Sequence, residues 1–346
     1  MIKKFILLSF LFSIFFISKS YSENSRFYEF DKGIIALMYH RFDENKYPST
    51  NIQMDIFKEH IAIIKKLKIE FLNPINLKEK ILKPNEKKKV LITIDDGFES
   101  FYNNAWPFLK ENKIPFILFV STKDVGKKGY MSWKQIKELE NSKIVVIGNH
   151  SHTHDYLVDE TDKNIIEDIE KSINSFKDNL GYNPEYFSYP FGEYSSNFKK
   201  IINDYNFTLA FGQHSGVIDS TKDLFELPRF PINENYGELD RFKFIIKTLP
   251  FQFKKIYPEN KYLLTDENPP DVKIYFFEEQ KNLKNITCYS NDSNKWKQSE
   301  IVFKEKNILH IKIKEKFTTE RGRINCSLND NGFWRWLGIQ FVISEY

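Results

Sequence analysis

Short strand-like segments and longer helix-like segments alternate between residues 33 and 250, and this alternation restricts the possible folds more than any other feature. The strand-like segments are apolar and rich in β-branched residues, as expected of strands buried on both faces. The helix-like segments carry apolar residues at helical spacing, most clearly over 162–180, where the stripe ends before Gly181. Strands are expected at 33–39, 90–94, 115–120, 144–147, 186–189 and 207–211, and helices at 54–67, 102–111, 132–139, 162–180, 196–205 and 237–249. This order predicts an α/β fold in which crossover helices join parallel strands.

The pattern changes after residue 250. Closely spaced prolines mark residues 251–271 as a linker. From residue 272 to residue 346, short runs of alternating apolar and polar residues follow one another, which predicts a small antiparallel β-sandwich. The chain is therefore expected to contain a larger α/β domain and a smaller β domain.

The first 22 residues have the organisation of a secretory signal peptide. Two lysines precede an apolar run over 5–17, and the small residues Ser20 and Ser22 provide a cleavage site after position 22. The apolar run is shorter than the about 20 residues that span a bilayer. An uncleaved membrane anchor is the alternative interpretation. In either case we expect an exported protein that resides in the periplasm, in the cell envelope or outside the cell.

Charge is balanced along the rest of the chain. The formal net charge is +4, and three of the lysines belong to the N-terminal segment. Lysine-rich stretches elsewhere are mixed with acidic residues, so they do not form a basic field. We therefore expect no nucleic-acid partner, and contact with a membrane only through the N-terminal segment if it is not cleaved.

The chain has two cysteines, Cys288 and Cys326, and both lie in the expected sandwich. In an exported chain an even pair favours a disulfide bond. In the chain-entropy model such a bond would stabilise the folded state by about 4 kcal/mol. Two buried free thiols are the alternative.

Two of the expected strands end at potential metal ligands. Asp95 and Asp96 follow one strand, and His150 and His154 follow another. The four-residue spacing of the histidines lets both imidazoles face one point if a helical turn follows the strand. Two imidazole nitrogens and one carboxylate oxygen, with one position left open for water, form the ligand set of a catalytic zinc site. The second carboxylate is then available as a general base. Taken singly, the acidic pair also fits a turn, and the histidines also fit a polar surface tract.

These segments resemble the first two motifs of the polysaccharide deacetylases, also called the NodB-homology group or carbohydrate esterase family 4. The resemblance spans about residues 33–250, and two of its segments look most like the branch of the poly-N-acetylglucosamine deacetylases. It implies a distorted (β/α) barrel over 33–250 with fewer than eight complete units. The matching segments are 36–42 (ALMYHRF), 93–97 (TIDDG), 130–133 (YMSW), 150–154 (HSHTH) and 188–192 (SYPFG).

The resemblance also assigns roles to the residues at the strand ends. It places a divalent metal, expected to be zinc, on Asp96, His150 and His154. It makes Asp95 the general base, for which capping the helix that follows is the alternative. His152 lies between the two histidine ligands and is expected to point away from the metal by alternation.

Several residues are expected to bind the substrate. The third motif, Tyr189, Pro190, Phe191 and Gly192, is expected to form a groove wall. Trp133 is expected to line the cleft, although packing in the interior explains it equally well.

This chain lacks an arginine that the resemblance would place just before the third motif. Many relatives carry an arginine just before the third motif that orients the base, whereas this chain has Ser188 there and no arginine between Arg41 and Arg229. Either other groups hold Asp95 or Arg229 extends into the site, and we place Arg229 with the substrate-binding residues. An ordinary surface arginine is the alternative.

The proton donor is expected to be a histidine near a strand end. His40 ends the first strand, on the rim where barrel enzymes carry out their chemistry. His214 follows a later strand and is the second candidate. The pair Leu309 and His310 matches the last family motif by letters, but it lies in the β-patterned tail and is discounted.

The resemblance and the ligand motifs together predict a metal-dependent hydrolase that removes N-acetyl groups from N-acetylated sugars of a polysaccharide. Two other functions remain open: a glycan-binding protein of the same fold with impaired catalysis, and an O-acetyl esterase or other metallohydrolase. In the small β domain, Trp334 and Trp336 share one face and form either a buried pair or a sugar-binding surface.

Overall fold

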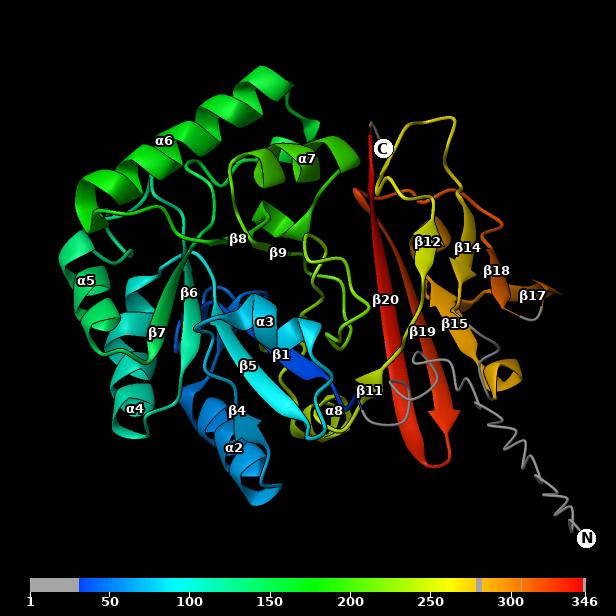
Figure 1. Ribbon diagram of the computed structural model, residues 1–346, viewed down its shortest axis with the longest axis horizontal. Coiled ribbons are helices and arrows are strands. Elements are labelled where there is room, and N and C mark those ends of the chain that lie inside the picture. Colours follow the sequence, from blue (N-terminus) through cyan, green and yellow to red (C-terminus); the bar gives the residue numbers. More distant parts are fainter. Residues whose placement is uncertain (1–30, 278–281, 306, 345–346) are drawn as a thin grey trace, which may run out of the picture.

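The computed structural model describes residues 31–277, 282–305 and 307–344 (Figure 1). The signal peptide expected over 1–22 lies outside these residues. Within the described ranges, no helix combines the length and the apolar character needed to cross a bilayer.

A parallel sheet forms the centre of the larger domain. Its strand order is β10-β1-β5-β6-β7-β8-β9, with β4 beside the start of β5. All of its strand pairs are parallel, as the alternation of strands and helices predicts. The strands are β1 (Ile34–Tyr39), β4 (Glu70–Phe71), β5 (Lys89–Ile94), β6 (Phe116–Val120), β7 (Val145–Asn149), β8 (Tyr186–Ser188), β9 (Leu209–Phe211) and β10 (Phe230–Pro231).

The sheet is curled, so that its two edges approach each other. The last strand, β9, exchanges backbone hydrogen bonds with Leu224 and Leu227, and the chain then continues directly into β10. Strand β10 pairs with β1 at the opposite end of the strand order. The carboxyl ends of β1, β5, β7 and β8 are thereby brought to one rim, where the predicted site residues lie.

Helices cover the outside of this sheet (Figure 1). Two expected helices differ from the structure. The helix expected over 102–111 begins as a π-helical turn, because Pro107 lacks the amide hydrogen that would continue an α-helical pattern. The last expected helix is shorter, because Leu249 and Pro250 form a strand of the second domain. The helical segments are α2 (Met54–Lys66), α3 (Leu77–Leu82), η1 (Phe101–Ala105), α4 (Trp106–Glu111), α5 (Trp133–Asn141), α6 (Asp162–Leu180), α7 (Ser196–Asp204) and α8 (Leu239–Ile245).

Two smaller sheets pack against each other as a sandwich after residue 248, and the strand pairs within them are mostly antiparallel. Their facing side chains form one apolar core, which includes Ile274, Ile311, Ile324 and Phe341. One sheet contains β11 (Leu249–Pro250), β13 (Tyr262–Leu263), β15 (Thr287–Ser290), β16 (Lys297–Gln298), β19 (Arg321–Asp330) and β20 (Phe333–Ile343). The other contains β12 (Lys255–Tyr257), β14 (Asp271–Tyr275), β17 (Glu300–Glu305) and β18 (Ile308–Lys312).

The segment expected to be a linker, 251–271, instead contributes to this sandwich. Strand β12 pairs with β14, and β13 pairs with β20. Phe251 and Leu263 are buried in the sandwich core. Their burial explains the difference, because apolar side chains in this segment gain more from packing than from exposure.

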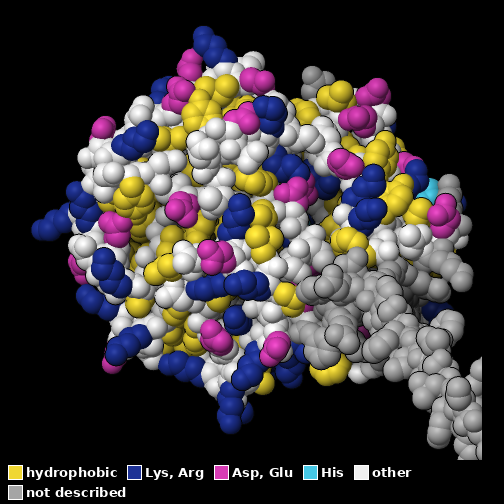
Figure 2. All heavy atoms as spheres, in the orientation of Figure 1, with side chains coloured by type: hydrophobic (Ala, Val, Ile, Leu, Met, Phe, Trp, Pro, Cys, Tyr) yellow, Lys and Arg dark blue, Asp and Glu magenta, His cyan; other side chains and the backbone are white. Residues whose placement is uncertain are grey.

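The surface mixes charges of both signs. On the face shown in Figure 2, lysine and arginine side chains are interspersed with acidic ones over both domains.

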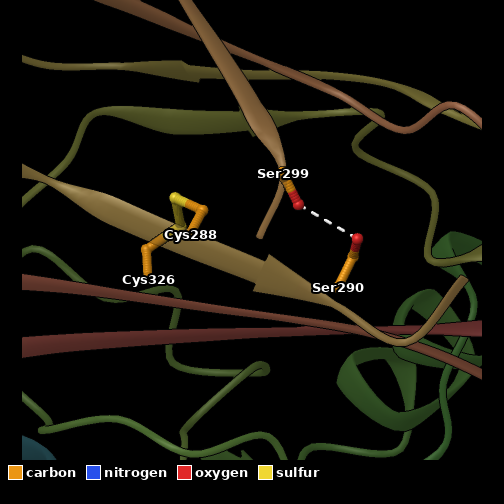
Figure 3. Close-up of a disulfide and its surroundings, with 4 residues drawn as sticks. All are labelled: Cys288, Ser290, Ser299 and Cys326. Atoms are coloured by element: carbon orange, nitrogen blue, oxygen red, sulfur yellow. Dashed lines mark hydrogen bonds between the residues drawn. A yellow bond between two sulfur atoms is a disulfide. The ribbon is translucent and has the colours of Figure 1, made fainter. Parts of the chain in front are cut away.

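The expected disulfide is confirmed. Cys288 of β15 and Cys326 of β19 are directly opposite each other in the antiparallel pair and are bonded, with their Cα atoms 4.0 Å apart (Figure 3). Both side chains are fully buried in the sandwich core. Beside the disulfide, the hydroxyl of Ser299 donates to that of Ser290 at 3.0 Å.

Replacing both cysteines with serine is expected to lower the free energy of unfolding of the sandwich by about 4 kcal/mol in the chain-entropy model. The reason is that the bond removes conformations from the unfolded chain across a separation of 38 residues. Urea unfolding followed by tryptophan fluorescence, with and without a reductant, measures the difference. Two free thiols in the denatured, unreduced wild-type protein would contradict the bond.

Candidate active site

Three predicted metal ligands converge at the rim of the parallel sheet. Asp96 follows β5, His150 follows β7, and His154 lies in the loop after His150. The Oδ1 atom of Asp96 lies 3.3 Å from Nε2 of His150 and 3.3 Å from Nε2 of His154. One ligand atom from each of the three residues lies within 4.8 Å of the other two. The ligand set predicted from the sequence is therefore assembled at one point.

The geometry of this cluster fits a tetrahedral ion. Bonds of 2.0–2.2 Å to a tetrahedral zinc ion separate its ligand atoms by about 3.3–3.6 Å, which agrees with the two distances of 3.3 Å. Oδ1 of Asp96 and Nε2 of His150 are buried and have no hydrogen-bond partner among the described residues. Because buried polar atoms are normally satisfied, a cation between these two atoms would supply the missing partner of both.

The protonation state of the ligands also suits a metal. Nδ1 of His150 lies 2.7 Å from the backbone carbonyl oxygen of Ser188. Because a carbonyl oxygen can only accept a hydrogen bond, Nδ1 must carry the proton. This hydrogen bond leaves Nε2 with a free lone pair directed at Asp96.

The backbone at the cluster is strained. Asp96 has a φ of 74°, and His154 has a φ of 58°. Both are in the left-handed region, which costs a non-glycine residue about 1–3 kcal/mol and is concentrated at functional sites. The surrounding contacts maintain this conformation, since Ser151 Oγ accepts a hydrogen bond from the amide of His154 at 3.1 Å.

Asp168 of α6 holds the loop between the ligands, and the sequence interpretation missed it. Its carboxylate accepts hydrogen bonds from the amides of His152 and Thr153 and from the hydroxyl of Thr153, at 2.7–3.0 Å. The ring of His152 contacts Thr122 and lies outside the ligand cluster, as expected. Asp168 is 5% exposed on the apolar stripe of α6. A carboxylate on the apolar stripe of a helix was the sequence signal that could have identified Asp168 as a functional residue.

Asp95 is held by Arg229 in a buried ion pair. The two terminal nitrogens of Arg229 donate to the two carboxylate oxygens of Asp95 at 2.7 and 2.8 Å. Both side chains are fully buried. The remaining donors of Arg229 reach Ser188 Oγ, Gly212 O and Thr93 Oγ1.

This pairing decides between the alternatives left open for Arg229. The arginine is not on the surface, and its burial removes it from direct contact with a substrate, which corrects the substrate-binding role expected for it. It makes the contact with the base that the resemblance assigns to an arginine just before the third motif. Burial alone would raise the pKa of Asp95, but Arg229, then His150 and His40, outweigh it and keep the pKa below its usual value. Asp95 is therefore ionised at neutral pH and able to accept a proton.

Both candidate proton donors face the same cavity as Asp96. The charges acting on His40 come from Asp96, Asp95, Arg229 and His150, so it lies beside the ligand cluster. Burial lowers the pKa of His40 more than the carboxylates Asp96 and Asp95 raise it.

His214 has a different environment. Burial is the main cause that lowers the pKa of His214 to about 3, followed by Lys261, Lys222 and Arg229. His214 also lines a second, smaller pocket together with Lys222 and Lys261. The discounted His310 contacts Asp271 within the second domain.

The third motif contributes one residue to the cavity. Phe191 lines it, stacks on Tyr156 with ring centroids 4.1 Å apart, and meets the edge of His154 at 4.7 Å. Tyr189, Pro190 and Gly192 are buried instead, which corrects their expected role as a groove wall. Tyr189 packs in an apolar cluster, because its side chain points away from the rim.

Trp133 is also corrected. It is the first residue of α5, and its ring packs edge-on against Phe176 of α6 at 5.5 Å. It does not line the cavity beside Asp96. The interior packing left open for Trp133 is therefore the role that the structure supports.

Comparison with known proteins identifies the larger domain. Residues 82–210 match the family model described as polysaccharide deacetylase. This part of the chain, which includes the TIDDG and HSHTH motifs, is therefore similar to the polysaccharide deacetylases. The resemblance inferred from the TIDDG and HSHTH motifs is thereby confirmed.

Individual relatives agree with the deacetylase assignment. The poly-beta-1,6-N-acetyl-D-glucosamine N-deacetylase of Staphylococcus aureus is 26% identical over 176 residues, which make up 46% of this chain and 58% of that protein. The chain thus matches little more than half the length of this curated relative.

Solved structures share the fold of the deacetylase domain. IcaB from Ammonifex degensii has a TM-score of 0.56 and 26% identity over 62% of this chain and 97% of its own. The Streptococcus pyogenes deacetylase PplD, solved in complex with acetate, has a TM-score of 0.54 and 24% identity over 59% of this chain and 94% of its own. The expected distorted barrel of the NodB type is therefore confirmed.

Proposed function

We propose that this chain is a metal-dependent hydrolase that removes N-acetyl groups from N-acetylated sugars of a polysaccharide outside the cytoplasm. The observation that carries the proposal is the ionised Asp95, fixed by Arg229, beside the assembled ligands Asp96, His150 and His154. The relative from S. aureus, a poly-beta-1,6-N-acetyl-D-glucosamine N-deacetylase, supports an N-acetylglucosamine polymer as the substrate. Export is proposed from the N-terminal segment of the sequence.

The ligand set supports zinc as the metal. Two imidazoles and one carboxylate are the donors of many catalytic zinc sites, and the distances from Asp96 to His150 and to His154 fit tetrahedral spacing. When bound, a zinc ion lowers the pKa of water from about 15.7 to about 7 and polarises a carbonyl oxygen.

The residues of the chain supply the proton transfers. A carboxylate oxygen of Asp95 accepts the proton of the attacking water, and Arg229 keeps that carboxylate ionised and oriented. The departing amine needs a proton to leave, and His40, beside the ligand cluster in the same cavity, donates it. Phe191 forms the apolar wall next to His154.

Acetate release tests the proposed function. Zinc-loaded protein is incubated with β-1,6-linked N-acetylglucosamine oligomers and, in parallel, with O-acetylated sugars. Release of acetate and appearance of free amines from the N-acetylated oligomers supports the proposal. Release from the O-acetylated sugars alone would make the chain an esterase, and release from neither by metal-loaded protein would contradict hydrolysis.

His40→Ala is expected to lower turnover by about 100-fold, the scale of losing a general acid, with metal affinity nearly unchanged. Because burial lowers the pKa of His40, the donor loses its proton as the pH rises through mildly acidic values, and this alkaline limb of the pH–rate profile should flatten in the variant. His214→Ala is the matched control, since His214 lines the same cavity but lies beside Lys261 and Lys222. A larger loss of turnover in His214→Ala than in His40→Ala would transfer the role to His214.

A further inference from the structure

The sheet formed by β19 and β20 has two chemically different faces. Side chains alternate along each strand, so Ile324 and Cys326 of β19 and Leu337 and Ile339 of β20 lie on the face that forms the sandwich core. The opposite face is polar, and we call it the barrel-side face. It carries Arg321, Arg323, Asn325, Trp336, Gly338 and Gln340, with Arg323 directly opposite Gln340 and Asn325 directly opposite Gly338.

The barrel-side face is fixed against the deacetylase domain. The amide of Gly338 donates to the carbonyl oxygen of Ser215 at 2.6 Å, and Gly216 forms a β-bridge with Leu337. A Cβ atom at position 338 would lie 2.5 Å from that same oxygen, so the close approach requires glycine. In Figure 1, β19 and β20 lie on the side of the sandwich toward the barrel.

One cavity is shared by the catalytic rim and this face. Its volume is about 640 Å³, within the range of about 300–1,000 Å³ typical of ligand sites. The barrel contributes His40, Asp96, His154 and Phe191 to its lining. All six residues of the barrel-side face line it as well. The predicted ligand cluster therefore opens into a cleft between the two domains.

Two buried donor atoms on the barrel-side face have no hydrogen-bond partner among the described residues. Nε2 of Gln340 and Nε1 of Trp336 are buried without a hydrogen bond, and Gln340 is 6% exposed. Arg323 donates from Nε to Gln340 Oε1 at 3.2 Å, and no carboxylate of the described residues lies within ion-pair distance of it. Arg321, by contrast, pairs with Glu193 and Glu320.

A second unpaired guanidinium faces the cleft from the barrel. Arg241 of α8 donates to the backbone carbonyl oxygens of Pro231 and Tyr236, and it has no carboxylate partner among the described residues. The cleft thus holds two guanidinium groups that form no ion pair with a carboxylate of the described residues, although Glu193 and Glu320 lie near enough to act on Arg323. Such groups recognise carboxylates and phosphates through paired hydrogen bonds.

We propose that the barrel-side face is the second wall of the substrate cleft and that Arg323 selects glycans carrying an anionic group on a sugar near the N-acetylated one. The proposal rests on the proposed function, since it names the substrate class of that same site. Arg323 supplies the charge, Arg241 adds to it from the facing wall, and Gln340 supplies an amide donor to the same group. The deacetylated product carries an ammonium group, which these arginines repel.

Two soluble probes separate charge recognition from general sugar binding. Hyaluronan hexasaccharide alternates N-acetylglucosamine with a sugar acid, whereas penta-N-acetylchitopentaose is neutral. Their affinities are measured by calorimetry on the zinc-loaded, full-length Asp95→Asn protein, which turns over slowly. Initial rates of acetate release by the zinc-loaded wild-type sequence give KM values for the same two glycans.

Arg323→Gln is expected to weaken binding of the hyaluronan fragment about tenfold or more, and that of the neutral oligomer by less than threefold. Arg323→Lys should recover part of the affinity, because it keeps the charge. Added salt should weaken hyaluronan binding in the parent protein and much less in Arg323→Gln. Lys163→Gln is the matched control, since this lysine of α6 has an 84% exposed side chain away from the cleft.

The outcomes distinguish this proposal from the proposed function. Anion selection is overturned if the parent protein binds both glycans with equal affinity. It is also overturned if Arg323→Gln and Arg323→Lys change the affinity for both glycans equally. Either result counts against it even if acetate is released. Acetate release from no glycan, together with Arg323-dependent binding of hyaluronan, overturns the proposed function and leaves the anion-selecting wall in place.

Discussion

His150→Ala is expected to lose bound metal and turnover together. His150 is the fully buried member of the cluster, and its Nε2 lies 3.3 Å from the Asp96 oxygen and 3.9 Å from a carboxylate oxygen of Asp95, without a hydrogen-bond partner among the described residues. Removing it leaves two protein ligands where catalytic zinc sites have three. Metal content after dialysis should fall well below one ion per chain, and acetate release should fall to the uncatalysed level.

His152→Ala is the matched control for this experiment. His152 lies between the two histidine ligands in sequence, but its ring contacts Thr122 and stays outside the cluster. This variant should keep one metal ion per chain and most of the turnover. Circular dichroism of both variants checks that the fold is retained. Stoichiometric metal in a folded His150→Ala protein would exclude His150 as a ligand.

The sequence predicted the ligand cluster because its geometry is local. Asp95 and Asp96 leave a buried strand together, and His150 ends another strand two places along in the sheet order. Parallel strands bring their carboxyl ends to one rim, so the strand pattern and the ligand types were sufficient to assemble the cluster. The helix over 162–180 was predicted for the same reason, since its apolar stripe and Gly181 are local signals.

The contacts that the sequence could not decide join distant segments. Arg229 is 134 residues from Asp95, so the sequence left open whether its guanidinium extends into the site or lies on the surface. The barrel-side face lies more than a hundred residues beyond the barrel motifs, and only tertiary packing brings it to the cleft.

Matching a family motif by sequence alone also gave the wrong position for some side chains. Tyr189 belongs to a matched motif, yet its side chain is fully buried, while Phe191 in the same motif faces the cavity. Phe191 has a φ of 57°, so simple strand alternation does not hold across the motif. Asp168 was missed for the opposite reason, because it belongs to no motif and acts only by holding the loop of His152 and Thr153.

The buried pair of Asp95 and Arg229 should make stability depend on pH. The folded-state pKa of Asp95 is lowered, mainly by Arg229 acting against the effect of burial. Its stabilising contribution is therefore complete above the unfolded pKa of about 3.9 and is lost as the pH falls through the folded pKa. The Asp95→Asn variant has no titrating group at this position. Its free energy of unfolding should therefore change less over the same acidic range than that of the parent protein.

Asp95→Asn is expected to keep the metal and to lose turnover by at least about 100-fold. An amide cannot accept the proton of the attacking water, whereas the cluster of Asp96, His150 and His154 does not include Asp95. The variant should also unfold more easily by about 3–5 kcal/mol, because it leaves the buried Arg229 guanidinium without a counter-charge. Asp155→Asn, an exposed carboxylate one residue beyond His154, is the matched control and should behave as the parent sequence. Metal analysis decides between the two neighbouring carboxylates: loss of the ion from folded Asp95→Asn would mean that Asp95, and not Asp96, is the ligand.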